Sequence, residues 1–251
     1  MKENNSFILG IKHGLPICFG YLSVSFAFGI FAVGSGLTVI EALLISMFNL
    51  TSAGQLAAVP IITGGGGMPE LALAQLIINL RYSLMSVTLS QKLGKTVSGL
   101  DRFWIAFGVT DEIFAVSTSK NRSVGRIYML GLILTPYLGW SIGTLLGAVA
   151  GNILPDSISS ALGIAIYGMF VAIVIPTAKR HLPTALCVLG AIAVGCAFKY
   201  LPMLSAVPDG FVIIITAILA SAVAALLAPI ADEETDSSGE KPAEKEESAN
   251  A

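Results

Sequence analysis

Long apolar runs fill most of this chain, and they restrict what it can fold into more than any other feature. Roughly 20 helical residues are enough to cross the hydrocarbon core of a bilayer. Apolar runs extend over residues 15–36, 38–62, 68–92, 103–118, 127–150, 158–178, 182–199 and 210–230. The charged residues amount to 12%, which is about half of the share in soluble domains. The sequence therefore predicts an all-α, polytopic membrane helix bundle with six to eight membrane segments.

The last 20 residues have a different composition. From Asp232 onward they hold eight of the sixteen acidic residues and two of the fourteen lysines and arginines. A segment with so few apolar side chains cannot bury enough surface to fold. We expect a membrane domain over residues 1–231 and an acidic, disordered tail over residues 232–251.

Lysines and arginines indicate which ends of the apolar runs face the cytoplasm. They flank the first run and follow the third, fourth and sixth runs, whereas residues 35–80 contain none. If every basic cluster is cytoplasmic, run 103–118 must enter and leave on the cytoplasmic side, and run 38–62 must enter and leave from outside. Six crossings then remain, with both termini in the cytoplasm. The alternative is that all eight runs span the membrane and the charge rule is locally broken.

Both re-entrant candidates have polar middles, NLTSAGQ at 49–55 and GVTDE at 108–112. Irregular backbone at membrane depth is tolerated only where protein buries it or where it lines a wet cavity. A helix broken at 49–55 offers free N–H groups to a carboxylate and free C=O groups to an ammonium. We therefore predict that this break belongs to a binding site, with contributions from Ser52, Gly54, Gln55 and, in the next run, Asn79. The alternative is that these polar groups only hold helices together.

Arg81 lies in the middle of run 68–92, where a cation costs about 2.5–3.5 kcal/mol. It is eleven residues from Lys92, or about 16 Å along a helix, and therefore cannot easily reach the surface on that side. We expect it to pair with Asp111 or Glu112. These adjacent acids point about 100° apart on a helix, so that one can hold Arg81 while the other faces a cavity. Two close carboxylates also suit proton exchange; the alternative is an ion pair that only fixes packing.

Three further patterns concern packing. Gly139, Gly143 and Gly147 recur every four residues, share a helix face and predict a close helix–helix contact. Glu41 and Glu70 lie near helix starts, where carboxylates act as caps. KHGLP at 12–16 and KRHLP at 179–183 hint at an internal repeat, although a match of five residues is also compatible with coincidence.

Several classes of protein find no support in the sequence. It contains no GxxxxGK[ST] nucleotide element and no basic patch of the kind that binds nucleic acid. Its three cysteines, Cys18, Cys187 and Cys196, have neither CxxC spacing nor neighbouring metal ligands. Without a nucleophile–base pair or a ligand set, we expect no cofactor, no metal site and no enzymatic activity.

Four segments resemble one known family. GLPICFGYLSVSFAFGI, SAGQLAAV, NLRYSLMSVTLS and GVTDEIFAV occur in this order and spacing in the AzlC family of branched-chain amino-acid permeases. The resemblance covers about residues 8–230. It implies export of branched-chain amino acids across the cell membrane, together with a small separate membrane subunit of the AzlD type. Many members carry His directly after the arginine of the NLR element, where this chain has Tyr82.

The charges and the resemblance lead to one hypothesis with alternatives. A zwitterion with an aliphatic side chain needs a cation or N–H partner, an anion partner and an apolar slot. Arg81 or the N–H groups of residues 52–55 suit its carboxylate, and Asp111 or Glu112 suits its ammonium or a coupling proton. The alternatives are a permease for another small zwitterion, a proton or small-ion channel, or a scaffold held by the ion pair.

Overall fold

The computed structural model describes residues 5–120, 122–155, 157, 167–168, 171–172, 174–204 and 206–227. Within these ranges the named elements are all helices, and four are long and apolar enough to cross a membrane: α1 (Phe7–Gly34), α4 (Met68–Lys92), α7 (Arg126–Gly151) and α9 (Leu182–Tyr200). The all-α membrane bundle is thereby confirmed. Run 158–178 lies mostly outside the described residues, and so does the tail.

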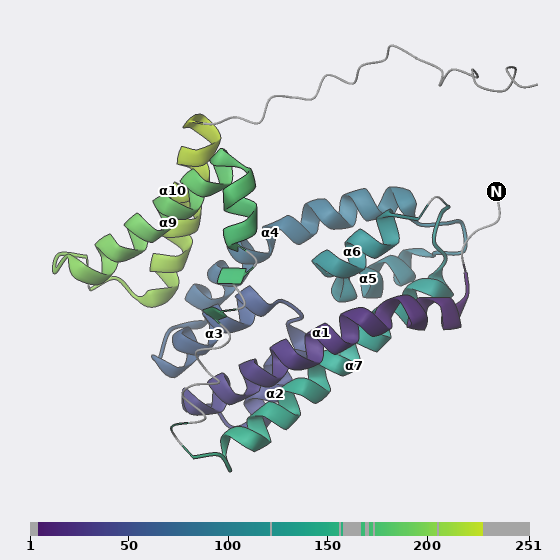
Figure 1. The fold of residues 1–251 in the computed structure, drawn as a ribbon, viewed down its shortest axis with the longest axis horizontal. Helices are drawn as coiled ribbons and strands as arrows, with labels where there is room; N and C mark the ends of the chain where they lie inside the picture. The colour runs from purple at the N-terminus through teal and green to yellow at the C-terminus, as the bar shows by residue number, and fades with distance from the viewer. Residues whose placement is uncertain are drawn as a thin grey trace, which may run out of the picture.

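Helices α1 and α7 pack side by side along their whole length (Figure 1). They are parallel, because Gly10 near the start of α1 meets Gly131, and Ile30 near its end meets Gly151. Gly139, Gly143 and Gly147 all face α1, with Cys18, Leu22 and Phe26 opposite them. A glycine face lets two backbones approach closely enough for van der Waals packing to hold them inside lipid.

Two short helices, α5 (Gly99–Gly108) and α6 (Asp111–Thr118), form a broken hairpin. The segments before and after them lie together, because Gly94 N–H donates to the Val124 carbonyl at 2.9 Å and Val124 N–H donates to the Lys92 carbonyl at 3.1 Å. The hairpin therefore enters and leaves at one end of the bundle, as expected for run 103–118. We call it the inner hairpin, because Lys92, Lys95, Arg122 and Arg126 gather near its base.

A second broken hairpin consists of α2 (Val39–Phe48) and α3 (Ser52–Thr63). It begins where α1 ends and leads into α4, whose far end lies beside the start of α7. Because α7 is parallel to α1, both ends of this hairpin lie at the end of the bundle opposite to the inner hairpin's base (Figure 1). We call it the outer hairpin; its course matches the expectation for run 38–62.

Local sequence explains where the half-helices begin and end. Thr38 and Glu41 form a reciprocal capping box at the start of α2, and Ser98 and Asp101 form another at the start of α5. Such boxes satisfy N–H groups that a helix start leaves unpaired. Each hairpin then breaks where the backbone becomes extended, over residues 49–51 in the outer one and 109–110 in the inner one.

Two separate apolar cores hold the two ends of the bundle. One joins α4, α5, α6 and α7 and includes Leu89, Ile105, Ile113, Tyr128 and Leu132. The other joins α1, α2, α3 and α7 and includes Phe28, Ala42, Val59 and Ala148. Val109, at the inner break, belongs to the first core, and Thr110 and Thr51 at the two breaks are buried as well.

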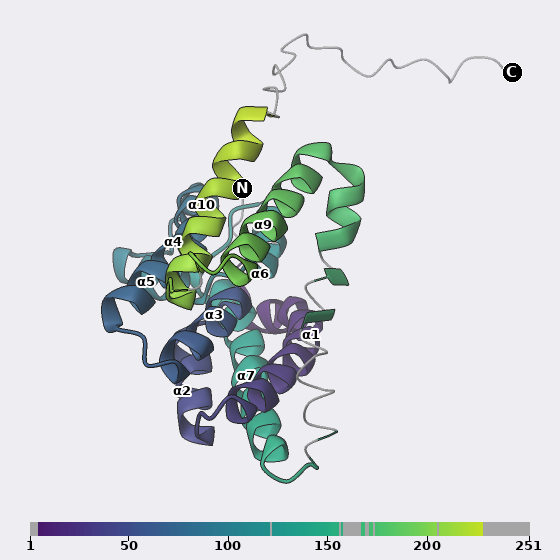
Figure 2. The same cartoon turned by 90° about the vertical axis from the view of Figure 1, so that its left-hand side faces the viewer.

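Helix α10 (Asp209–Leu227) packs with α9 on one side and with α3 and α4 on the other (Figure 2). Glu70 lies in the first turn of α4, where no side chain makes a capping hydrogen bond; its carboxylate instead accepts the Gly210 N–H at 2.9 Å, and the residue is 8% exposed. Glu70 therefore bonds to the start of another helix, α10, which sequence position alone did not indicate.

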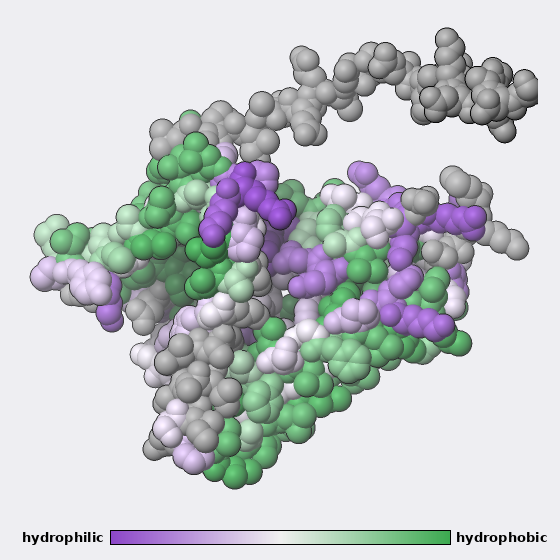
Figure 3. All heavy atoms as spheres, viewed as in Figure 1, coloured by the Kyte–Doolittle hydropathy of each residue, from purple (hydrophilic) through white to green (hydrophobic). Residues whose placement is uncertain are grey.

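The hydropathy of the surface fits a membrane environment. Apolar residues cover the face formed by α1 and α7, and hydrophilic residues gather near the start of α1 (Figure 3). Helix α9 has no buried residue, and α4 exposes Leu73, Leu76, Leu80 and Leu84. In water these helices would expose a large apolar area, whereas in a bilayer lipid covers it.

We predict that Gly147→Ala lowers the thermal stability of the purified protein in detergent, because a Cβ there would overlap the Phe26 carbonyl. Overpacking of this kind costs about 1–3 kcal/mol. The control is Gly190→Ala in α9, where a Cβ meets no described atom within 4 Å. A thermal unfolding midpoint that falls equally in both variants, or in neither, contradicts the close α1–α7 contact.

Candidate functional site

A pocket of about 460 Å³ lies where the tips of the two hairpins meet α1, α4 and α7. Its position between the two apolar cores follows from the breaks, because each break stops a helix before it fills the centre. The lining residues are Pro16, Ile17, Gly20, Tyr21 and Val24 of α1, Leu50 and Ser52 of the outer tip, Arg81 and Tyr82 of α4, Thr110, Asp111 and Glu112 of the inner tip, and Trp140 of α7.

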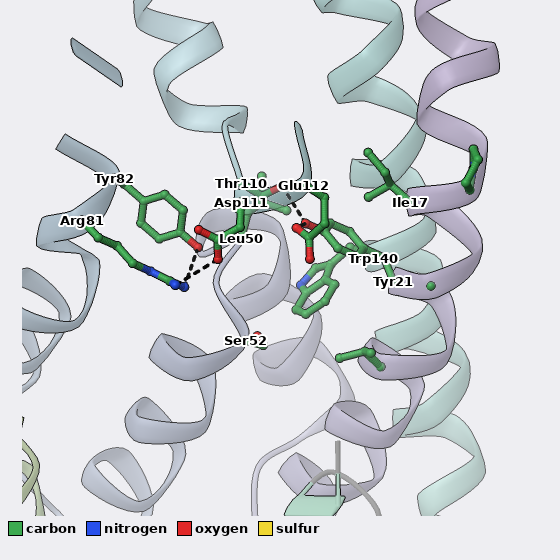
Figure 4. Close-up of a pocket in the computed structure, with 13 residues that line it drawn as sticks. Ile17, Tyr21, Leu50, Ser52, Arg81, Tyr82, Thr110, Asp111, Glu112 and Trp140 are labelled. Carbon is green, nitrogen blue, oxygen red and sulfur yellow. Dashed lines mark hydrogen bonds and ion pairs between the residues drawn. The ribbon is translucent and has the colours of Figure 1, made fainter. Parts of the chain in front are cut away.

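Arg81 and Asp111 form an ion pair across this pocket. Arg81 Nη1 lies 3.0 Å from Asp111 Oδ2, and the two side chains are 52% and 49% exposed. Figure 4 shows them pointing at each other between α4 and the inner tip. The guanidinium also lies over the Tyr82 ring, 5.1 Å from its centroid, and donates to the Tyr82 hydroxyl at 3.4 Å. The expected contact of Arg81 with one of the two acids is present.

Glu112 points away from this ion pair, toward α1 (Figure 4). Its carboxylate hydrogen-bonds to the Tyr21 hydroxyl, which is also 2.6 Å from Thr110 Oγ1. Tyr21 in turn packs edge-on against Trp140, with ring centroids 5.0 Å apart. Tyr21 thus joins α1 to the inner tip through the two neighbouring residues that flank Asp111.

The charges in the pocket do not balance. Arg81 and Asp111 neutralise each other, whereas the contacts of Glu112 among the described residues are with a neutral hydroxyl. Among the described residues, the pocket therefore holds one carboxylate without a cation partner. An ion in a cavity inside the membrane is expensive unless water, a proton or a cationic ligand accompanies it.

The outer tip offers donors rather than carboxylates. Helix α3 begins at Ser52, and its N-cap residue Thr51 makes no side-chain hydrogen bond to the first N–H groups. Apart from the outer tip, the buried indole Nε1 of Trp140 in α7 has no hydrogen-bond partner among the described residues. Unpaired N–H groups at a helix start attract anions, and thus the pocket has an acidic side at the inner tip and a donor side at the outer tip.

Of the residues predicted for a site, Arg81, Ser52, Asp111 and Glu112 line this pocket. The other three lie beside it, in contacts that hold the outer hairpin. Gln75 donates to the Gly54 carbonyl at 2.8 Å and accepts from Asn79 at 3.1 Å, and Gln55 donates to Ser46 at 2.9 Å. A direct role in binding stays a prediction for all seven residues.

Sequence reasoning missed Tyr21, Tyr82, Thr110 and Trp140, which complete the pocket. Tyrosine and tryptophan are frequent in membrane helices near the interface. Nothing in the sequence around Tyr21, Tyr82 and Trp140 indicates that they lie at a pocket instead. One signal was available: TVIE at 38–41 and SGLD at 98–101 are both capping boxes and precede both breaks at the same distance. That match indicates where the two tips lie in the sequence.

A multi-pass helical membrane protein whose broken hairpins meet at a charged central pocket is the class that this fold and site define. The chain belongs to the AzlC family: the model of that family, described as AzlC protein, matches residues 16–154. This range contains every residue that lines the pocket. No solved structure matches the chain.

Three relatives illustrate the similarity. An uncharacterized membrane protein of Archaeoglobus fulgidus is 33% identical over 208 residues, which cover 82% of this chain and 90% of the relative. The inner membrane protein YgaZ of Escherichia coli is 30% identical over 74% of this chain and 78% of its own length. The branched-chain amino acid transport protein AzlC of Bacillus subtilis is 23% identical over 64% of this chain and 66% of its own length.

We predict energetic coupling between Arg81 and Asp111. In a double-mutant cycle of Arg81→Gln and Asp111→Asn, the two stability losses should fail to add, with a coupling energy of about 0.5–3 kcal/mol, because they remove the same 3.0 Å contact. Thermal unfolding in nanodiscs measures it. The control cycle combines Asp111→Asn with Lys92→Gln, eleven residues along α4, and should be additive; strict additivity in both cycles contradicts the pairing.

Proposed function

We propose that this chain is a secondary transporter that exports branched-chain amino acids across the cell membrane in exchange for protons. The observation that carries the proposal is the polarity of the central pocket, with an unbalanced carboxylate on one side and unpaired N–H donors on the other. That arrangement complements a zwitterion. The name of the Bacillus subtilis relative, a branched-chain amino acid transport protein, supports the same substrate class.

The ammonium group of the substrate binds at Glu112 in this proposal. Asp111 is the weaker candidate because Arg81 already neutralises it at 3.0 Å. Glu112 has only the Tyr21 hydroxyl as a described partner. A substrate ammonium there would balance the pocket's charge.

The carboxylate group of the substrate binds at the outer tip. Ser52, the first residue of α3, lines the pocket, and this helix start has no side-chain cap. Leaving a buried donor unpaired costs about 1–3 kcal/mol, which a bound carboxylate would recover. Arg81 remains an alternative partner, provided that its contact with Asp111 loosens when substrate binds.

The remaining wall of the pocket suits an aliphatic side chain. Ile17 and Val24 of α1, Leu50 of the outer tip and the Trp140 ring supply apolar surface beside the polar groups. A volume of about 460 Å³ lies within the usual range of small-molecule sites. The mixture of one apolar wall and a few polar anchors favours leucine, isoleucine or valine over a charged amino acid.

Coupling to protons follows from competition for Glu112. With no cation partner, this carboxylate is balanced either by a substrate ammonium or by a proton, but not by both. We assume that the pocket changes the side of the membrane on which it opens only when the charge of Glu112 is neutralised. Export of an amino acid then requires import of a proton. The ion pair of Arg81 and Asp111 would stay neutral throughout and hold the inner tip against α4.

The orientation and partners of the chain belong to the same proposal. The basic end of the bundle faces the cytoplasm, as does the tail at residues 232–251, and residues 1–231 form the transport domain. A small AzlD-type membrane subunit is the expected partner. Helix α4 offers it a row of exposed apolar residues, Leu73, Leu76, Leu80, Leu84 and Val87.

We predict that the parent protein in proteoliposomes exchanges external for internal leucine and valine. We also predict that a proton gradient in the direction opposite to amino-acid movement drives net transport. Glu112→Gln should abolish both activities, because a neutral amide pairs with neither an ammonium nor a proton. The control is Glu41→Gln, which changes an exposed carboxylate in a capping box outside the pocket and should leave transport unchanged.

Two results would contradict this function. Undiminished exchange in Glu112→Gln would remove Glu112 from the mechanism. A proton conductance in the parent that persists without any amino acid would favour a channel instead.

A further inference from the structure

The chain contains two copies of one structural unit, and the copies are inverted. The first is α1 followed by the outer hairpin, over residues 7–63, and the second is α4 followed by the inner hairpin, over residues 68–118. Each unit has a long helix, a capping box, a half-helix of 10 residues, a break and a second half-helix. The weak sequence repeat KHGLP and KRHLP does not correspond to these copies.

The register of the two copies agrees closely. Capping residues Thr38 and Ser98 are 60 positions apart, and the half-helices of residues 39–48 and 99–108 keep that offset. The N-cap residues that follow the breaks, Thr51 and Thr110, are 59 apart. The units point in opposite directions, because α1 starts at the basic end of the bundle and α4 finishes there.

The chemistry of the copies differs where charge is concerned. The long helices start at Phe7 and Met68, 61 positions apart; counted from these starts, Arg81 in the second unit corresponds to Gly20 in the first, and both line the pocket. Asp111 and Glu112 after the second break correspond to Ser52 and Ala53 after the first. One pair of polar positions is nevertheless duplicated: each long helix has a pocket-lining tyrosine, Tyr21 or Tyr82, and each break has an N-cap threonine.

The two copies of this tyrosine–threonine pair make different contacts. Tyr21 of the first unit contacts Thr110 of the second at 2.6 Å, and this contact joins α1 to the inner tip. The corresponding contact would join Tyr82 of the second unit to Thr51 of the first. Instead, the Tyr82 hydroxyl accepts from Arg81, and Thr51 Oγ1 is buried without a partner in a residue that is 5% exposed.

We propose that Tyr82 and Thr51 form a second latch, which closes when the latch of Tyr21 and Thr110 opens. This inference rests on the proposed function, in which the pocket opens alternately to the two sides of the membrane. The first latch would hold the inner tip in one state, and the second latch would hold the outer tip in the other. An inverted repeat that adopts two arrangements exchanges the roles of its halves. The buried, unsatisfied hydroxyl of Thr51 is what the unused latch leaves behind in the state described here.

Substrate can drive the exchange because the first latch shares its tyrosine with Glu112. An ammonium or a proton on Glu112 removes one of the two contacts that hold Tyr21 at the inner tip, which leaves Thr110 alone to hold α1 there. A ligand shifts a two-state equilibrium only through such a difference in its contacts between the states. Tyr82 is available for the second latch once its hydroxyl leaves Arg81.

Cross-linking tests the alternation directly and without transport. In a background with Cys18, Cys187 and Cys196 changed to alanine, one protein carries Tyr21→Cys with Thr110→Cys and another carries Tyr82→Cys with Thr51→Cys. A short, membrane-permeant bifunctional thiol reagent should link the first pair readily. Adding Tyr21→Phe to the second protein should raise the yield of its cross-link. A second pair that never links, or that links equally with and without Tyr21→Phe, overturns the proposal whether or not the protein transports amino acids.

Conservative variants supply the matched functional test. Thr51→Val removes the unpaired hydroxyl, and thus the unfolding temperature of the purified protein should stay the same or rise, while leucine exchange falls by roughly tenfold, the effect of losing one good hydrogen bond from one state. Thr51→Ser keeps the hydroxyl and should retain exchange. Tyr82→Phe should match Thr51→Val, and the double variant should be no slower than either one.

The outcomes separate the two proposals. If the parent exchanges leucine but Thr51→Val does so equally well, the second latch is wrong and the proposed transport stands. If the parent exchanges no amino acid while the second pair links in response to Tyr21→Phe, the latches stand and the proposed substrate is wrong.

Discussion

Every backbone N–H and C=O group at membrane depth needs a partner, and this chain breaks two helices there. The breaks at 49–51 and 109–110 are tolerated because residues at both line one protein-enclosed pocket instead of facing lipid. The site is polar because Asp111 and Glu112 follow the inner break, whereas the start of α3 after the outer break has no side-chain cap. The ion pair of Arg81 and Asp111 then ties α4 to the inner tip at 3.0 Å.

Much of the architecture could be predicted from the sequence because lipid permits few solutions. Basic residues and polar run centres were enough to indicate that 38–62 and 103–118 are re-entrant, and the cost of an isolated intramembrane cation was enough to pair Arg81 with an acid. The parallel α1–α7 contact could not be derived, since a glycine stripe predicts a close neighbour without saying which helix it is. Glu70 shows the same limit: its partner, Gly210, is 140 residues away.

The pocket's chemistry was less predictable than its location. The polar residues near 49–55 were expected to bind solute, yet Gly54 and Gln55 make contacts between helices and Asn79 bonds to Gln75 of its own helix. Of the four positions predicted for this part of the site, Ser52 is the one that lines the pocket. Tyr21 and Trp140 were missed because aromatic residues in apolar helices are ordinary. Only the fold shows that Tyr21 reaches Glu112, and that this acid, unlike Asp111, makes no ion pair within the described part of the chain.

The central claim is that a proton and a substrate ammonium compete for Glu112, and proton release on binding measures it most directly. When leucine is added to the purified protein in weakly buffered detergent solution over a series of pH values, we expect a pH range in which up to one proton is released per leucine bound. The release should disappear in Glu112→Gln and remain in Glu41→Gln. Leucine binding that releases no proton, or that releases the same amount from Glu112→Gln, would contradict the account.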